Sequence, residues 1–178
     1  MRNAAVVLAA SVAFLAAGGS AHGPAIAQAA AASAMLDRLV GTWDGPGTFV
    51  DSAYSKAGTA DAKTTCAWSN DRQFVICQQH VVMNGKSTDD VAVYTYDAAA
   101  QKYHFYNIGP ARANATELTV AGDTMTYSDS FTDGSKHVST RTLNVWSSPK
   151  SYTWRAEYSL DGGATWTLMG SGTATRTN

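Results

Sequence analysis

The chain has 178 residues, of which 13 are lysine or arginine and 14 are aspartate or glutamate, and its formal net charge is −1. This length suits one domain of ordinary size. The basic residues are scattered, so the sequence offers neither the basic face that nucleic acid requires nor a basic amphipathic helix for a membrane surface. The expected partner is a small molecule or another protein, and the sequence does not indicate an oligomeric state.

The segment at 1–27 has the pattern of a secretory signal peptide. Arg2 precedes an uninterrupted run of apolar or small residues at 4–17, and A-x-A-like cleavage sites end at Ala21 and Ala27. The run is short for a membrane span, and no later stretch is apolar enough to make one. We predict cleavage after Ala27 and a periplasmic or secreted protein, with a retained membrane anchor as the alternative.

The folded domain is expected at 35–178, after an alanine-rich tether at 28–34. The segment SAMLDRL at 33–39 predicts one short helix, with Ser33 as its N-cap. Beyond this helix the sequence alternates with period two, so strands are expected for the rest of the chain.

These period-two segments are separated by turn signals about every ten residues, which is typical of an antiparallel sandwich or barrel. The expected strands are 39–50, 59–69, 73–83, 89–96, 102–109, 115–122, 123–131, 136–146, 151–159 and 164–176, the first bent at Gly45-Pro46-Gly47. Short connections make neighbours in sequence pair in space, and closure into a barrel removes the edge strands. We predict an all-β, antiparallel, up-and-down barrel of about 8–10 strands with a short N-terminal helix.

Two cysteines lie on consecutive predicted strands, in TTCAWSNDRQFVICQQHV. A four-residue loop at 70–73 places Cys66 opposite Cys77. Opposed strand positions have Cβ atoms about 4.5–5.5 Å apart, near the disulfide range, and exported proteins meet an oxidising compartment. We predict a Cys66–Cys77 disulfide rather than a redox site, because the close C-x-x-C spacing is absent.

Two segments carry a family resemblance. LDRLVGTWDGPGTF at 36–49 resembles the opening of the bacterial lipocalin-like family called DUF1579, with a short helix, a G-T-W element and a glycine-rich first strand. The element Gly41-x-Trp43 is also the first-strand signature of lipocalins at large. VAVYTYDAAAQKYHFYNI at 91–108 matches a second family feature, a Tyr-Asp turn followed by Lys-Tyr and a strand. The resemblance covers 36–176 and implies a lipocalin-like, calycin-type barrel with an internal ligand, without a known reaction.

Catalytic and cofactor signatures are absent from the sequence. There is no G-x-S-x-G nucleophile elbow, no phosphate loop and little material for the carboxylate pair of a glycosidase. His80, His104 and His137 lie on separate predicted strands without metal-ligand spacing. We predict no catalytic residue, no metal site and no cofactor. Haem is the alternative cofactor, with His104 as the best candidate for its ligand.

Aromatic residues carry the strongest functional signal. Tyr94 and Tyr96 share one strand face, and Trp154 shares another with two tyrosines. This spacing fits either a dry aromatic core or a ligand cavity with a few polar groups. Arg141 lies on an otherwise apolar face and requires an anionic partner if it is buried, either a structural carboxylate or that of a ligand. The ligand-binding candidates are Trp43, Tyr94, Tyr96, His104, Tyr106, Arg141 and Trp154.

The stretch YSLDGGATW at 158–166 fits the Asp-box, which resembles the repeated hairpin of sialidase-type propellers. A propeller needs repeated blades, and this chain has one copy, so we interpret the motif as the turn joining the last two strands. The predicted function is an exported protein that binds a small, partly apolar molecule. The alternatives are a cavity-based isomerase or hydrolase, and a non-catalytic envelope or protein-interaction domain with a filled barrel.

Overall fold

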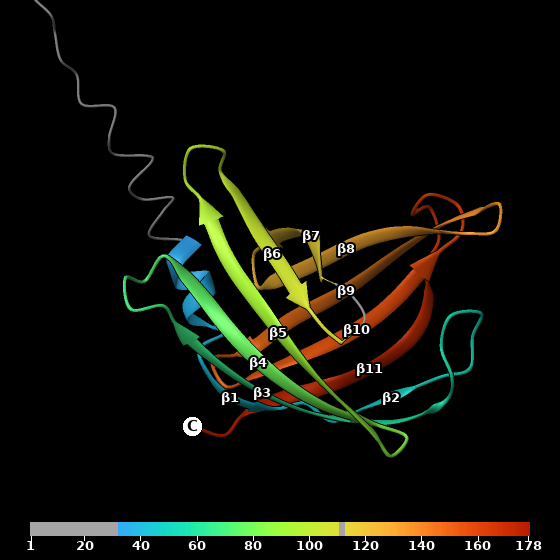
Figure 1. Cartoon of the computed structure of the whole chain (residues 1–178), viewed down its shortest axis with the longest axis horizontal. Helices are drawn as coiled ribbons and strands as arrows, with labels where there is room; N and C mark the ends of the chain where they lie inside the picture. The colour runs from blue at the N-terminus through green and yellow to red at the C-terminus, as the bar shows by residue number, and fades with distance from the viewer. Residues whose placement is uncertain (1–31, 111–112) are drawn as a thin grey trace, which may run out of the picture.

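The computed structural model describes residues 32–110 and 113–178, which form an antiparallel β-barrel with one short helix (Figure 1). The strands in these residues are β1 (Gly41–Asp44), β2 (Gly47–Phe49), β3 (Gly58–Trp68), β4 (Phe74–Met83), β5 (Lys86–Asp97), β6 (Lys102–Ile108), β7 (Ala113–Ala121), β8 (Thr124–Asp133), β9 (Lys136–Ser148), β10 (Ser151–Ser159) and β11 (Thr167–Arg176).

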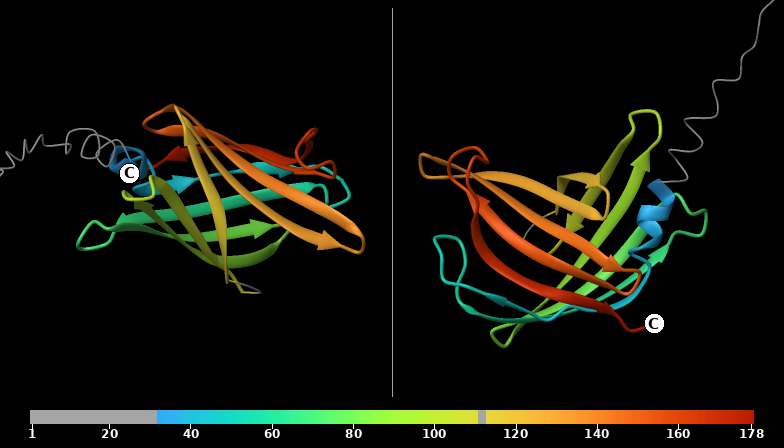
Figure 2. Two further views of the ribbon diagram at one scale, coloured as in Figure 1. Left: turned by 90° about the horizontal axis from the view of Figure 1, so that it is seen from above. Right: turned by 180° about the vertical axis from the view of Figure 1, so that it is seen from behind.

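Closure of the sheet comes from its first strand. From β3 to β11 each strand pairs with the next, while β1 and β2 each pair with both β3 and β11. They are two halves of one strand that bends at Gly45 and Pro46, so the closed barrel has ten strands. Figure 2 shows its curvature from two further directions. The predicted all-β up-and-down barrel is confirmed, and each predicted strand overlaps an observed one.

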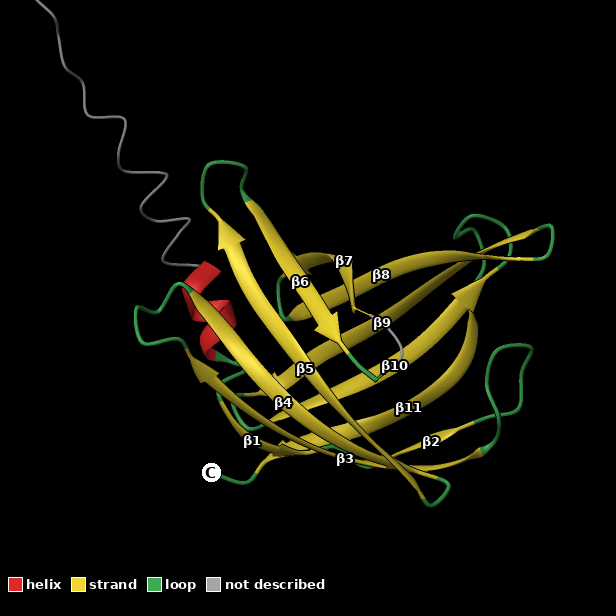
Figure 3. Ribbon diagram, in the orientation of Figure 1, coloured by secondary structure: helices red, strands yellow, loops and turns green. Residues whose placement is uncertain are grey.

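The helix at 32–37 lies at one end of the barrel (Figure 3). Its buried residues Met35 and Leu36, with Leu39 just beyond, join the hydrophobic core. Ser33 lies inside the helix and is exposed, so its prediction as N-cap is wrong. Ala32 is buried as well, so the folded domain begins before residue 35 and includes the end of the predicted tether.

The predicted signal peptide at 1–27 and the tether up to residue 31 lie outside the described residues. Within the residues that are described, no helix is long and apolar enough to cross a membrane.

The β3–β4 hairpin has the register that the cysteine spacing predicted. The Ser69 amide donates to the Phe74 carbonyl at 2.8 Å, and the pairing then runs in step to Cys66 opposite Cys77. Their Cα atoms are 4.0 Å apart and the two residues form a disulfide. Both are buried and face the barrel interior. The predicted disulfide is therefore confirmed.

Candidate functional site

A cavity of about 500 Å³ occupies the barrel interior. It exists because strands alternate side chains between two faces, and several inward positions carry only alanine or glycine. Its aromatic lining residues are Trp43, Phe49, Tyr94, Phe105, Tyr127, Tyr152 and Trp154. Its polar lining residues are Thr64, Gln79, Thr88, Asp90, Asn107, Thr142 and Asn144. The sequence was compatible with either a ligand cavity or a dry aromatic core, and the structure contains part of each.

Trp43 forms the floor of the cavity near the helix. Only 2% of its surface is exposed, and its indole Nε1 donates to the Leu39 carbonyl at 2.8 Å. Its ring centroid lies 5.1 Å from that of Tyr152, and the Arg176 guanidinium lies over the indole ring, 4.7 Å from the ring centroid. These contacts fix the end of the helical segment to the first strand, so the barrel is closed at this end.

Three tyrosines from separate strands, Tyr94, Tyr127 and Tyr152, line the same cavity. Tyr94 packs on Phe105 at 4.9 Å between ring centroids and on Tyr127 at 6.2 Å. Burial raises the pKa of Tyr94 to about 12 and raises the pKa values of Tyr127 and Tyr152 above their usual value as well, because a buried phenolate would lose its hydration. Near neutral pH these phenols are therefore uncharged hydrogen-bonding groups in an aromatic wall.

A second hollow of about 610 Å³ adjoins the cavity on the side away from the helix. The two share the lining residues Asp90, Phe105, Asn107, Tyr127 and Thr142. The second hollow, which we call the mouth, is bordered further by polar residues from β7 to β9, among them Asn114 and Asp129. The shared residues form the neck through which a molecule would pass from mouth to cavity.

Trp154 lines the cavity beside the bend in the first strand. Its ring centroid lies 5.8 Å from that of Phe49. A Cβ on Gly47 would stand 2.1 Å from Trp154 Cζ2, so only glycine fits there. The glycine-rich first strand thus makes room for an indole as well as allowing the bend.

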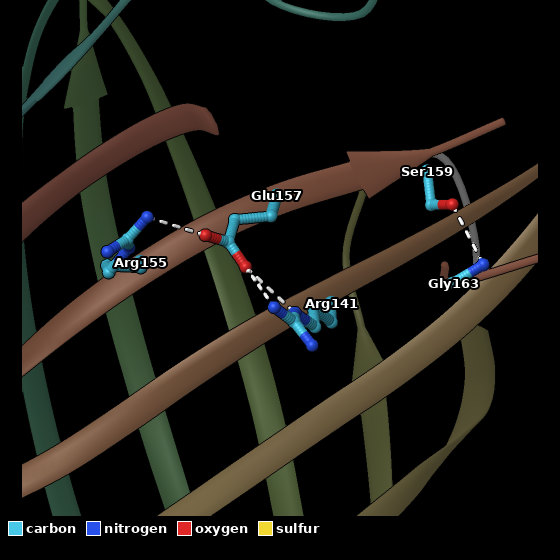
Figure 4. A network of polar contacts seen from close by, with 5 residues as sticks. All are labelled: Arg141, Arg155, Glu157, Ser159 and Gly163. Carbon is cyan, nitrogen blue, oxygen red and sulfur yellow. Dashed lines mark hydrogen bonds and ion pairs between the residues drawn. The ribbon is translucent and has the colours of Figure 1, made fainter. Parts of the chain in front are cut away.

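Arg141 does not point into the cavity. It alternates on β9 with Thr142, which lines the cavity, and its side chain binds Glu157 across the outer face of β10. Arg141 Nε and Nη2 both lie 2.8 Å from Glu157 Oε2, and Arg155 Nη2 lies 2.7 Å from Glu157 Oε1 (Figure 4). Trp166 covers the Arg141 guanidinium at 4.0 Å. The structural salt bridge weighed for Arg141 is confirmed, and this residue borders the mouth without a free guanidinium.

The other sequence-predicted site residues divide between the two faces. Trp43, Tyr94 and Trp154 line the cavity. Tyr96 packs on Tyr103 at 4.8 Å, near the helix and outside the cavity lining. His104 and Tyr106 stack on each other on the opposite face of β6 from Phe105 and Asn107, so they lie outside the barrel.

Histidine ligation of an internal group has no support in this geometry. No histidine lines the cavity in the part of the chain that the structure describes, and the described residues hold no group of three metal-ligating side chains. His80 Nδ1 lies at hydrogen-bond distance, 2.7 Å, from Asp89 Oδ1 on the outer face. The alternative that His104 ligates haem inside the barrel is therefore wrong, because alternation along β6 turns its ring outward.

Sequence reasoning missed the polar half of the cavity. Asp90 lies two and four positions before Ala92 and Tyr94, so strand alternation puts all three on one face. Asn107 follows Phe105 in the same way. The signal was therefore in the sequence, but it becomes legible only when the inward face of each strand is known.

The Asp-box is a self-contained hairpin. Asp161 accepts hydrogen bonds from the Thr165 amide at 2.9 Å and the Thr165 hydroxyl at 2.6 Å. Figure 4 shows the bond in which Ser159 Oγ accepts from the Gly163 amide at 2.8 Å. The bond from Thr165 holds the pKa of Asp161 down to about 2. Gly162 and Gly163 have φ values of 70° and 94°. These contacts satisfy the motif internally and fix the segment that carries Trp166 over Arg141.

Comparisons with known proteins place the fold. No family model and no curated protein matches the chain, so membership of DUF1579 stays a prediction. The crystal structure of Rv2717c from M. tuberculosis has a TM-score of 0.57 and 13% identity, over 83% of this chain and 98% of that one. The S-type phycobiliprotein lyase CPES from Guillardia theta has a TM-score of 0.55 and 10% identity, over 82% of this chain and 92% of that one. At such identities the likeness concerns architecture alone, and the architecture of this chain is a closed, lipocalin-like antiparallel barrel.

Proposed function

We propose that the protein binds one small, partly apolar molecule inside its barrel. The observation that carries this proposal is the cavity of about 500 Å³, because ligand sites have volumes of about 300–1,000 Å³ and combine aromatic walls with a few polar groups. Trp43, Tyr94 and Trp154 supply aromatic wall, and the neck supplies the polar groups. A barrel packed solid would leave no room for such a molecule, so the cavity favours binding over a purely structural role.

We also propose that the protein is exported and is a divergent member of the DUF1579 family. The signal-peptide pattern at 1–27 and the Cys66–Cys77 disulfide support export, since disulfides persist in oxidising compartments. The G-T-W element supports the family, because Trp43 closes the barrel floor as a lipocalin-like first strand would. A cavity-based enzyme is the second candidate function, favoured by one observation: a structure with the same architecture is a lyase.

The direct experiment is native mass spectrometry of the protein purified from its own envelope. We expect a mass above that of the chain cleaved after Ala27. The excess should correspond to a small molecule that leaves the protein on unfolding. A neutral fluorescent probe, N-phenyl-1-naphthylamine, gives a second readout, because its emission rises when it enters an apolar cavity.

Paired variants on β3 make this test specific. Ala62 faces the cavity, whereas Ala67 is exposed on the outer face of the same strand. Ala62→Phe places a phenyl ring in the cavity and should weaken probe binding at least tenfold, while Ala67→Phe should leave binding unchanged. Equal binding by both variants would refute an internal site. A retained molecule that is chemically converted on incubation would favour the enzyme instead.

A further inference from the structure

Within the described part of the chain, one charged side chain lines the cavity, and it is a carboxylate. Among the described residues that line the cavity, Asp90 is the only one that is acidic or basic. It lies at the neck, since it borders both the cavity and the mouth. A charge that faces a partly apolar cavity is costly unless a partner neutralises it.

No described residue fills that role. The Asp90 carboxylate makes no hydrogen bond or ion pair within the described part of the chain. Its neighbour Gln79, directly opposite on β4, donates its side-chain amide to Thr64 at 2.9 Å instead. Arg141, the one described cation that borders the mouth, is held by Glu157 on the outer face.

Gly109, the residue directly after β6, lies against Asp90 and leaves room for its carboxylate. A Cβ on Gly109 would stand 2.3 Å from Asp90 Oδ1 and 3.9 Å from the side-chain oxygen of Asn107. Any larger residue at 109 would displace the carboxylate. The side-chain oxygens of Asp90 and Asn107 thus both lie close to Gly109 at the neck, and Thr142 borders the same passage from β9. Oxygen acceptors that lie near one another suit a group that donates several hydrogen bonds.

We propose that the ligand of this cavity is a cation: a partly apolar amine whose ammonium group pairs with Asp90 at the neck while its apolar body lies among Trp43, Tyr94 and Trp154. This inference rests on the proposed function and adds the charge of the ligand to it. An anionic ligand would meet the Asp90 carboxylate at the neck and is disfavoured. A neutral ligand would leave the carboxylate unpaired.

The experiment compares three molecules with one naphthyl body, by displacement of N-phenyl-1-naphthylamine at pH 7 from the full folded chain. These are 2-naphthylmethylamine, 2-naphthylmethanol and 2-naphthoate. A charge-assisted hydrogen bond corresponds to about tenfold to 100-fold in affinity, so the amine should bind that much more tightly than the alcohol, and the carboxylate should bind most weakly.

Two variants on β5 isolate the carboxylate. Asp90→Asn keeps the shape and removes the charge, and should bring the amine to the affinity of the alcohol, whose own affinity should change less than about twofold. Asp89→Asn makes the same change of net charge on the outer face, where Asp89 contacts His80, and should keep the preference for the amine. Added salt should weaken the amine alone.

The outcomes separate this inference from the proposed function. One outcome would separate them: the wild type binds the alcohol as tightly as the amine, and Ala62→Phe prevents this binding. In that case the cation assignment is wrong while internal binding stands. A preference for the amine that survives Asp90→Asn also overturns the assignment. If no molecule, including the probe, enters the cavity, the proposed function fails and this inference fails with it.

Discussion

Reduction of the Cys66–Cys77 disulfide offers a test whose magnitude follows from the chain itself. The two residues are 11 apart in sequence, and a cross-link stabilises mainly by restricting the unfolded chain. The loop-closure relation for a loop of this length gives about 3 kcal/mol at 25 °C. We expect a mild thiol reductant to lower the free energy of unfolding by that amount, and the folded barrel to persist, since strand pairing already holds Cys66 opposite Cys77.

The assay is urea unfolding of the wild-type chain with and without reductant, followed by tryptophan fluorescence. Because the effect lies in the unfolded state, the dependence on urea should steepen on reduction, as the longer free chain exposes more surface. The double variant Cys66→Ala, Cys77→Ala should be insensitive to reductant and serves as the control. A loss below about 1 kcal/mol with an unchanged slope would refute the reasoning, and would mean that the native hairpin, not the cross-link, dominates.

Three further predictions concern single side chains. Glu157→Ala should lower the free energy of unfolding by about 2 kcal/mol, measured in urea, because Arg141 loses a charge-assisted partner, and an effect near zero would contradict this. Burial raises the pKa of Tyr94 to about 12, so between pH 10 and 12 this tyrosine ionises in the unfolded chain but not in the folded one, and the free energy of unfolding should fall by about 3 kcal/mol over that range. Tyr94→Phe should flatten that decline. The pKa of Asp161 is lowered to about 2, so its contribution is present above pH 4 and is lost toward pH 2; Asp161→Asn should lower the Tm at pH 6 and weaken its fall in acid, and an unchanged profile would show that the hydrogen bonds to Thr165 do not matter.

Much of the fold could be predicted because strand alternation and turn chemistry are local. The four-residue loop after Ser69 gave the whole β3–β4 register, and with it the disulfide, from spacing alone. The helix boundary was wrong because N-caps depend on backbone dihedrals, and a helix that extends back to Ala32 leaves Ser33 inside it. Residue type alone did not distinguish a capping serine from a helical one.

The candidate site was predictable only in part, since facing is a property of the closed barrel. Trp43, Tyr94 and Trp154 point inward, but His104, Tyr106 and Arg141 are on the outer face, where Arg141 finds Glu157. A shift of one residue exchanges the two faces of a strand, and no local pattern distinguished an inward polar residue from an outward one in β6 or β9.

By itself the sequence determined what neighbouring residues decide: an antiparallel meander, the cysteine pairing, and the Asp-box as a hairpin whose hydrogen bonds are satisfied within a few residues. Only the tertiary structure decided that β1 and β2 close the sheet between β3 and β11, that this leaves a cavity of about 500 Å³, and that Asp90 faces into it without a described partner. The reason is physical. Closure and cavity volume depend on residues that are distant along the chain, because the space between side chains is set by every strand at once.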